Sequence, residues 1–287
     1  MARRGALLLF FSAVLFGVIG ALVKRLSLVQ STESLVFFRN AVGLLALLPL
    51  MGLWGKDGLA TREFGSHAYR ALSGLGGMYL SFFALGRMPL ADAMALGYTA
   101  PLFMPFIARF RLGEAMPRHV APALALGFLG VLLILKPGVG VFRPVALAAL
   151  GSGLLAAVAQ VGIRHLTRTE PSYRIVFYFG LVSTVVSGIP VAFRWRTPPT
   201  SLWPMLALVG GLATAAQLLL TAGYRRTSPA RGGPMMYVAV ATAGAMDWLL
   251  WRRLPDALSL AGVAAIVGSG AYILRRSGAT VLDGGAA

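Results

Sequence analysis

The sequence predicts an all-α membrane protein with ten transmembrane helices arranged in two inverted five-helix repeats. Three observations lead to this fold class. The 287 residues are 57% hydrophobic and 12% charged, with a mean hydropathy of +0.77, whereas a soluble domain is about 25% charged. The charges divide the chain into ten long uncharged stretches. The two halves of the chain also carry similar residues at a nearly constant offset.

Each uncharged stretch is long enough, with its flanks, to cross a bilayer. A spanning helix needs about 20 mostly apolar residues, and helices are expected because lipid offers no partner to free backbone groups. The first stretch is longer than the apolar core of a signal peptide and is followed by the basic pair Lys24-Arg25, so we expect it to be retained. In chain order the stretches cover residues 5–23, 40–55, 71–86, 93–108, 120–135, 144–163, 175–193, 197–224, 232–246 and 257–274.

The distribution of basic residues predicts the orientation of the helices. With the N-terminus in the cytoplasm, the inside loops hold 16 basic residues and the outside loops hold 9. Lys and Arg are enriched in the cytoplasmic loops of membrane proteins. We therefore expect a multi-pass protein of a bacterial inner membrane with both termini in the cytoplasm. The small, polar segment 277–287 is expected to be a disordered tail.

The segments 1–140 and 141–276 are predicted to be structural repeats. At an offset of 140 residues, Val36-Phe37-Phe38 aligns with Val176-Phe177-Tyr178, and at an offset of 139 Tyr98 aligns with Tyr237. Each half holds five stretches, an odd number, so the second half must enter the membrane inverted. Inverted repeats are typical of secondary transporters, whose substrate site lies between the halves near the midplane. Two unrelated five-helix bundles are the alternative.

Several motifs stand out along the chain: Arg70-Ala71-Leu72, the segment from Ala84 to Ala93, the segment from Tyr98 to Phe103, Leu112-Gly113-Glu114, and Ala222-Gly223-Tyr224-Arg225-Arg226 with Pro234 and Tyr237. These motifs resemble the EamA-type branch of the drug/metabolite transporter superfamily. The resemblance covers nearly the whole chain and implies ten spans, a 5+5 inverted repeat and alternating-access transport, often export of amino acids or other small metabolites. The branch also includes importers of adenosyl-methionine and flavin-like compounds. This chain differs from the family pattern after its ninth span, where Trp251-Arg252-Arg253 replaces a frequent Gly-Glu pair.

Two ionisable residues are expected well inside spans, where charges are expensive and mark functional sites. Arg39 in the second span and Asp247 in the ninth lie at a similar predicted depth below the outer surface, so a gating ion pair is one interpretation. The alternatives are that Arg39 extends to the outer headgroups and that Asp247 faces a water-filled vestibule. Asp92 opens the fourth span and is expected to cap that helix.

Gly and Pro residues, which tend to break helices, occur in the third, fourth, eighth and ninth spans, and we expect these spans to lie nearest the substrate site. We expect a central cavity lined by spans 1–4 and 6–9, with spans 5 and 10 peripheral. Aromatic and Met side chains would contact apolar parts of a solute, and Arg39 and the glutamines would hold its polar or carboxylate groups. For each polar residue the alternative is an interhelical hydrogen bond. The predicted substrate-binding residues are Arg39, Tyr79, Phe82, Tyr98, Gln160, Gln217, Met235 and Tyr237.

These features predict a secondary transporter that exports amino acids or related zwitterions by alternating access. Since Arg39 is the one basic residue expected inside a span, a multiply charged phosphate ester fits poorly. The alternatives are an uptake carrier for a larger adenosyl-methionine- or flavin-like metabolite, and a channel or lipid-handling protein. We expect no catalysis, cofactor, metal site or nucleic-acid partner, because the chain has no cysteine and its three histidines sit at span ends. The expected partners are a small-molecule substrate and the bilayer, with the chain acting as a monomer or homodimer.

Overall fold

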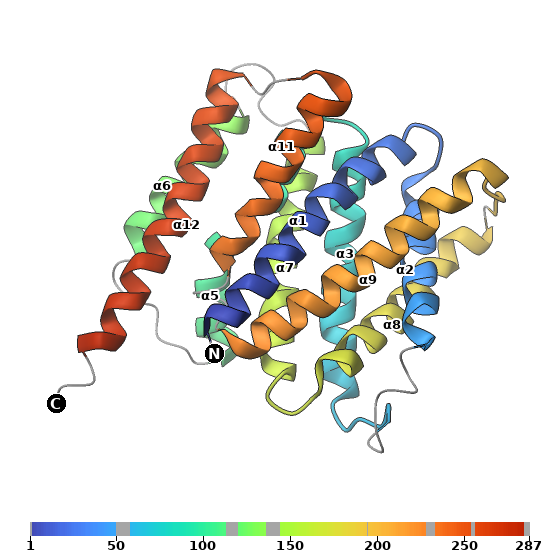
Figure 1. Cartoon of the computed structure of the whole chain (residues 1–287), viewed down its shortest axis with the longest axis horizontal. Coiled ribbons are helices and arrows are strands. Elements are labelled where there is room, and N and C mark those ends of the chain that lie inside the picture. The colour runs from blue at the N-terminus through green and yellow to red at the C-terminus, as the bar shows by residue number, and fades with distance from the viewer. Residues whose placement is uncertain are drawn as a thin grey trace.

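The computed structural model describes residues 2–49, 58–112, 120–135, 144–193, 195–227, 233–253 and 256–283. Within these ranges every regular element is a helix, and the helices form one bundle (Figure 1). The helices of the first half are α1 (Ala2–Leu26), α2 (Thr32–Leu47), α3 (Phe64–Leu85), α4 (Leu90–Gly97), α5 (Ala100–Leu112) and α6 (Val120–Leu135). Those of the second half are α7 (Pro144–Leu166), α8 (Ser172–Phe193), η2 (Thr200–Leu202), α9 (Trp203–Arg226), η3 (Gly233–Tyr237), α11 (Val238–Trp251) and α12 (Ala257–Asp283).

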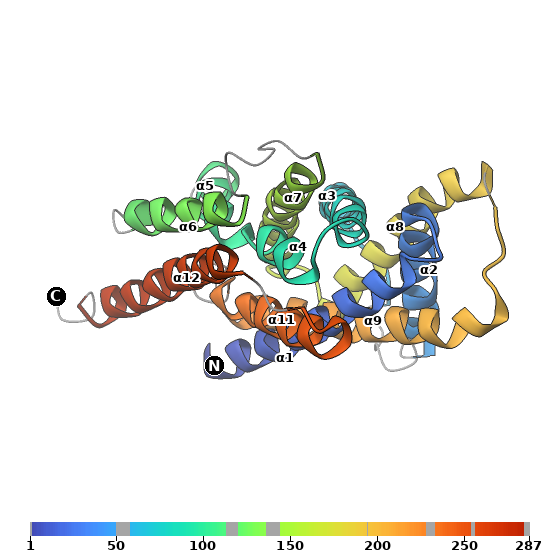
Figure 2. The same ribbon diagram turned by 90° about the horizontal axis from the view of Figure 1, so that it is seen from above.

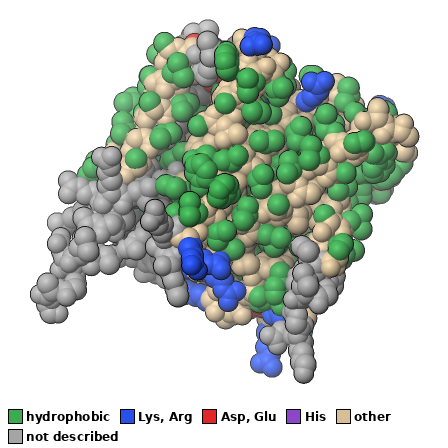
Figure 3. Space-filling view, viewed as in Figure 1, with side chains coloured by type: hydrophobic (Ala, Val, Ile, Leu, Met, Phe, Trp, Pro, Cys, Tyr) green, Lys and Arg blue, Asp and Glu red, His purple; other side chains and the backbone are tan. Residues whose placement is uncertain are grey.

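The surface and the helix lengths are those of a multi-pass membrane protein. Figure 3 shows hydrophobic side chains over the middle of one face, with Lys and Arg side chains near its upper and lower edges. Such a band is typical of a surface that faces lipid. The fold class is therefore all-α and membrane-spanning, and the full count of ten spans stays a prediction. The segments long and apolar enough to cross a bilayer include Arg4–Leu26, Leu90–Arg111, Pro144–Leu166, Ser172–Phe193 and Thr200–Arg226.

Helix boundaries follow local backbone chemistry rather than the nearest charge. α2 begins at Thr32 because the Ser31 hydroxyl accepts a hydrogen bond from the Ser34 N–H at 3.3 Å, which satisfies a free donor of the first turn. The predicted stretch 40–55 starts later, so Arg39 lies in the middle of the helix rather than near its outer end. At the other end of the chain, α12 continues to Asp283 and includes part of the segment for which the sequence predicts a disordered tail.

The fourth and ninth spans are both interrupted, and the interruptions lie at matching places in the two halves. α4 ends at Gly97 and α5 begins at Ala100, so Tyr98 lies in the break. In the second half the 3-10 helix η3 gives way to α11 immediately after Tyr237. Discontinuous helices at corresponding places of two repeats are typical of transporter binding sites. The two repeat-related tyrosines therefore mark the two breaks.

The helix packing follows the pseudo-symmetry of two repeats. α2 packs against its repeat partner α8, and α6 against its repeat partner α12. The contact of α3 with α7 is matched by that of α1 with α9, and the contact of α5 with α7 by that of α1 with α11. Figures 1 and 2 both show α6 and α12 side by side at one end of the bundle. The two halves therefore exchange equivalent contacts, as expected of a two-repeat fold.

Glycine allows the helices to approach closely at the break in the fourth span. A Cβ atom on Gly153 of α7 would lie 3.0 Å from the carbonyl oxygens of both Leu96 and Gly97. Gly17 of α1 plays a similar part against α11, because a Cβ atom there would lie 2.9 Å from the Ala239 carbonyl oxygen. These close approaches bring α1 and α7 against the interrupted spans, around the centre of the bundle.

Candidate functional site: a central cavity with two buried arginines

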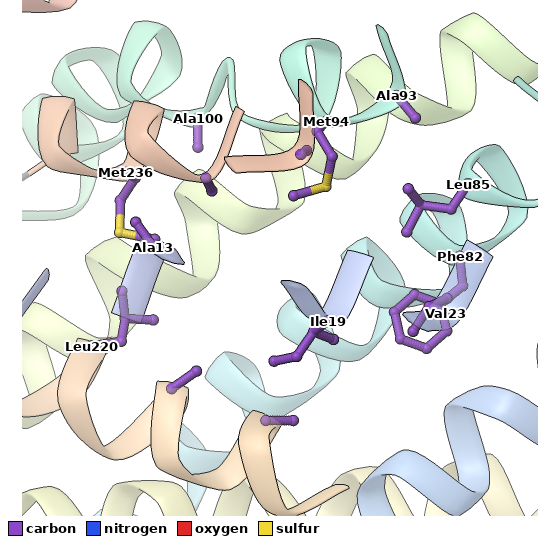
Figure 4. Packing of buried hydrophobic residues seen from close by; sticks show 14 of the residues in the cluster. Ala13, Ile19, Val23, Phe82, Leu85, Ala93, Met94, Ala100, Leu220 and Met236 are labelled. Atoms are coloured by element: carbon purple, nitrogen blue, oxygen red, sulfur yellow. The ribbon is translucent and has the colours of Figure 1, made fainter. Parts of the chain in front are cut away.

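A cavity of about 180 Å³ lies where the two halves meet. Its walls come from α1, α2, α3, α4, α5, α7, α8, α9 and η3, and none of the described lining residues belongs to α6 or α12. Figure 4 shows apolar side chains from several of these elements around the same space. The residues that line the cavity and are labelled there include Ile19, Phe82, Met94, Leu220 and Met236.

Five of the predicted binding residues line this cavity, and three do not. Tyr79 packs against the hydrophobic core, and its hydroxyl group has no hydrogen-bond partner among the described residues. Met235 packs against the core, Tyr237 belongs to it, and neither residue lines the cavity wall. Adjacent residues of a 3-10 helix point about 120° apart, so their neighbour Met236 in η3 can line the wall instead. The predicted residues on the wall are Arg39, Phe82, Tyr98, Gln160 and Gln217.

The two glutamines both line the cavity and bridge helices. The side-chain carbonyl of Gln160 on α7 accepts a hydrogen bond from the Tyr224 hydroxyl on α9. The side-chain carbonyl of Gln217 on α9 accepts one from the Arg70 Nη2 at 2.7 Å. Each glutamine therefore makes the interhelical hydrogen bond that was the alternative to a binding role. Both still line the space in which a ligand would lie.

The structure does not bring Arg39 and Asp247 together. The Arg39 Nη1 donates to the side-chain oxygen of Asn40 at 2.7 Å. Asp247 is buried, and its Oδ2 accepts a hydrogen bond from the backbone N–H of Ala91 at 3.2 Å. That N–H belongs to the first turn of α4, where the helix dipole favours a negative charge. Asp92 lies in the same first turn, and a gating role for Arg39 and Asp247 stays a proposal.

Arg70 is a site residue that the sequence analysis missed. The spans were delimited by their charges, which placed Arg70 outside the third span, but α3 begins at Phe64 and includes it. Its side chain is 2% exposed and its guanidinium carbon lies 3.7 Å from the centre of the Phe179 ring. The sequence signal that could have identified Arg70 is the glycine four residues later. Gly74 leaves room for the arginine side chain, because a Cβ atom there would lie 3.0 Å from the Arg70 Nη1.

Electrostatics distinguish this cavity from an ordinary apolar core. Arg39 is 7% exposed, and its guanidinium carbon lies 5.5 Å from the centre of the same Phe179 ring. Neither Asp nor Glu is among the described residues that line the cavity. The described residues also contain no group of three or more His, Asp or Glu that could hold a metal ion. The cavity is thus a basic site with apolar and aromatic walls.

A second polar cluster joins the two halves at the end of the bundle where α3 begins. Glu170, between α7 and α8, accepts hydrogen bonds from the Thr61 hydroxyl and from the Arg174 Nη1, the latter at 2.6 Å. The His67 ring of α3 packs on the Tyr178 ring with 4.6 Å between their centres. Burial alone raises the pKa of Glu170, but these hydrogen bonds and the nearby positive charges lower it below the usual range.

Comparison with known proteins assigns the chain to a family. The EamA-like transporter family matches residues 3–136 and again residues 143–275, once in each half. The chain belongs to the EamA-like transporter family. The family motif that includes Gly113 and Glu114 lies outside the residues that the structure describes.

Relatives of this EamA transporter include carriers of several small molecules. It is 33% identical to the pseudopaline exporter of Pseudomonas aeruginosa over 272 residues, covering 93% of this chain and 94% of the exporter. It is 26% identical to a riboflavin transporter of Brucella anthropi, covering 86% and 89% of the two chains. It is 24% identical to an S-adenosylmethionine uptake transporter of Rickettsia bellii, covering 83% and 82%. The EamA chain is therefore a membrane transporter of small molecules.

The fold also matches a solved structure. A crystal structure of a protein with 21% sequence identity superposes with a TM-score of 0.72 and covers 95% of this chain and 98% of that one. At this level of identity the likeness concerns the fold alone.

Proposed function

We propose that this EamA transporter exports a small metabolite related to amino acids across the inner membrane by alternating access, with the central cavity as its substrate site. The observation that carries this proposal is the position of buried Arg39 and Arg70 in a cavity whose walls come from both repeats. Guanidinium groups match the geometry of carboxylates. The similarity to the pseudopaline exporter supports the direction of transport.

Each part of the cavity wall has a role in this proposal. The two guanidinium groups bind the carboxylate of the substrate, and Phe16, Phe82 and Met94 contact its apolar parts. Polar groups on the wall, such as Gln160, offer hydrogen bonds to the remaining polar atoms. Because the walls come from both halves, rocking of one repeat against the other would open the cavity to each side in turn.

The charge of the cavity favours an anion or zwitterion over a cation. S-adenosylmethionine carries a positively charged sulfonium group, and two buried arginines without a lining carboxylate would repel it. The uptake of such a compound is therefore the less favoured of the functions that the relatives suggest.

The proposal is tested by transport in vesicles reconstituted with the purified chain and loaded with labelled amino acids. A carrier gives saturable flux and counterflow, whereas a channel does not. We expect Arg39→Gln, Tyr98→Ala and Gln160→Ala to weaken apparent affinity about five- to a hundredfold, because each removes about 1–3 kcal/mol of hydrogen bonding in a desolvated site. Tyr237→Ala tests whether the repeat-related tyrosine, which packs in the core and does not line the cavity, also contributes to binding.

Exposed Arg87 provides the matched control, since its guanidinium stacks on Phe83 outside the cavity. Arg87→Gln is expected to leave flux unchanged. Absence of saturable flux for every amino-acid-related compound would refute the proposed function.

A further inference from the structure

Arg39 and Arg70 share one aromatic ring, and this arrangement places two like charges in the same buried space. Arg39 comes from α2, Arg70 from α3, and Phe179, whose ring both guanidinium groups approach, from α8. The guanidinium carbons lie 5.5 Å and 3.7 Å from the ring centre. Two positive charges repel one another strongly when they are withdrawn from water. An aromatic ring attracts each cation, but it carries no charge and cannot neutralise the pair.

The partners of the two guanidinium groups on the protein are neutral. Arg70 donates from Nη2 to Gln217, and its Nε and Nη1 atoms are buried with no hydrogen-bond partner among the described residues. Arg39 donates from Nη1 to Asn40. Buried charges in proteins are normally paired, and buried donors are normally hydrogen-bonded. Arg70 is 98% buried, and its N–H donors without a hydrogen-bond partner therefore indicate an anionic ligand.

The charge balance determines how many anionic groups this ligand carries. One carboxylate would neutralise one arginine and leave the other cation buried, whereas two carboxylates neutralise both. The arginines are held on different helices and by different partners, Asn40 and Gln217, so each keeps its own set of donors. A guanidinium group can bind a carboxylate through two parallel hydrogen bonds. Two separate carboxylate sites next to one aromatic ring are the arrangement that satisfies these groups.

We propose that the cavity selects a small metabolite with two carboxylates, one for Arg39 and one for Arg70, whose carbon chain lies across Phe179. This inference rests on the proposed function and names the substrate class of the same site. Among the described residues of the wall, none of which is Asp or Glu, a substrate amino group would find only neutral oxygen atoms, such as those of Ser81 and Ser152. The site thus prefers acidic members of the amino-acid class over neutral zwitterions.

Binding of matched ligands to the purified protein tests the inference independently of transport. Glutarate and butyrate differ by one carboxylate, and L-glutamate and L-glutamine differ by one charge at nearly constant size. We expect glutarate to bind at least tenfold more tightly than butyrate, and glutamate at least tenfold more tightly than glutamine, measured by calorimetry. Diaminopentane, which carries two positive charges, is expected not to bind.

Variants of the two arginines then assign the carboxylates. Arg39→Gln and Arg70→Gln should each reduce glutarate affinity to about that of butyrate, and the double variant should abolish binding of both. Arg87→Gln, which removes an exposed arginine that stacks on Phe83, should change neither. If a Gln variant does not fold, Arg39→Lys and Arg70→Lys can be used instead. These variants keep the positive charge but lack the planar guanidinium group, and they should bind glutarate with intermediate affinity.

The outcomes separate this inference from the proposed function. Equal affinity for glutarate and butyrate, together with equal affinity for glutamate and glutamine, would overturn the two-carboxylate site and leave amino-acid export intact. Unchanged glutarate affinity in both Gln variants would also overturn it. If no compound with one or two carboxylates binds or is transported, the proposed function fails as well.

Discussion

Gly74 controls the position of the Arg70 guanidinium. A Cβ atom at residue 74 would lie 3.0 Å from the Arg70 Nη1 and 3.1 Å from the Phe179 ring edge. Gly74→Ala should therefore shift the Arg70 guanidinium by a few tenths of an ångström. We expect little effect on stability, because the end of an arginine side chain is flexible. Binding sites tolerate displacements of only about 0.5 Å, so we expect a roughly three- to tenfold loss of affinity for the carboxylate ligand in a calorimetric titration.

Gly76 offers a control on the same helix. A Cβ atom there would meet only the end of the Leu155 side chain, at 3.1 Å. Gly76→Ala should bind the ligand as tightly as the unmodified chain does. Equal losses of affinity in both variants would show that α3 itself, and not the arginine, responds to the added methyl group.

Glu170 makes part of the stability of the protein dependent on pH. Its pKa is lowered in the folded protein, so the carboxylate stabilises the fold at every pH above its ordinary value near 4.5. This stabilisation is lost as the pH falls through the lower, folded-state pKa. We expect the melting temperature in detergent to fall in this acidic range, and to fall less steeply in Glu170→Gln, whose amide cannot titrate there.

At the scale of elements, Asp247 connects α11 to the first turn of α4. The side chain accepts the Ala91 N–H across the interface between the halves. Replacement of such a cap by Ala costs about 0.5–2 kcal/mol, and Asn caps about as well as Asp. We expect Asp247→Ala to lower the melting temperature and Asp247→Asn to preserve it. If Asp247→Asn instead abolishes flux while the protein stays folded, the negative charge itself acts in gating.

The break between α4 and α5 also depends on the close approach of α7. Gly153 leaves no space for a side chain beside the carbonyl oxygens of Leu96 and Gly97. These are backbone atoms, so Gly153→Ala should cost about 1–3 kcal/mol through overpacking, seen as a lower melting temperature. Gly151→Ala should be nearly neutral, because its Cβ would meet only the end of the Leu80 side chain. Similar melting temperatures for both variants would contradict this account of the break.

At the scale of the whole molecule, the predicted orientation can be tested by labelling single cysteines, because the chain has none of its own. Val29 lies in the exposed turn between α1 and α2, and exposed Thr169 lies in the turn between α7 and α8. With cytoplasmic termini, Val29→Cys should react with a membrane-impermeant maleimide in intact spheroplasts. Thr169→Cys should react only after permeabilisation, and the reverse pattern would invert the topology.

The sequence alone determined the class of the molecule and much of the candidate site. Long uncharged stretches indicate membrane helices because the bilayer requires apolar length along a single segment. The matching positions of Tyr98 and Tyr237 predicted related places in the two halves, and the structure interrupts both spans there. Arg39, Phe82 and Gln217 were identified from span position and residue type, and all of them line the cavity.

Only the tertiary structure decided which side chains meet. Arg70 was assigned to a loop because the spans were delimited at charges, whereas the fold buries it against Phe179, far away in the sequence. An ion pair between Asp247 and Arg39 is one interpretation of their similar depth, whereas the fold places the Asp247 carboxylate against the first turn of α4. Depth along a helix can be read from residue spacing, but a contact also depends on the rotation of each helix and on its neighbours. These quantities are set by packing between residues distant in the chain, and they create the two-arginine site.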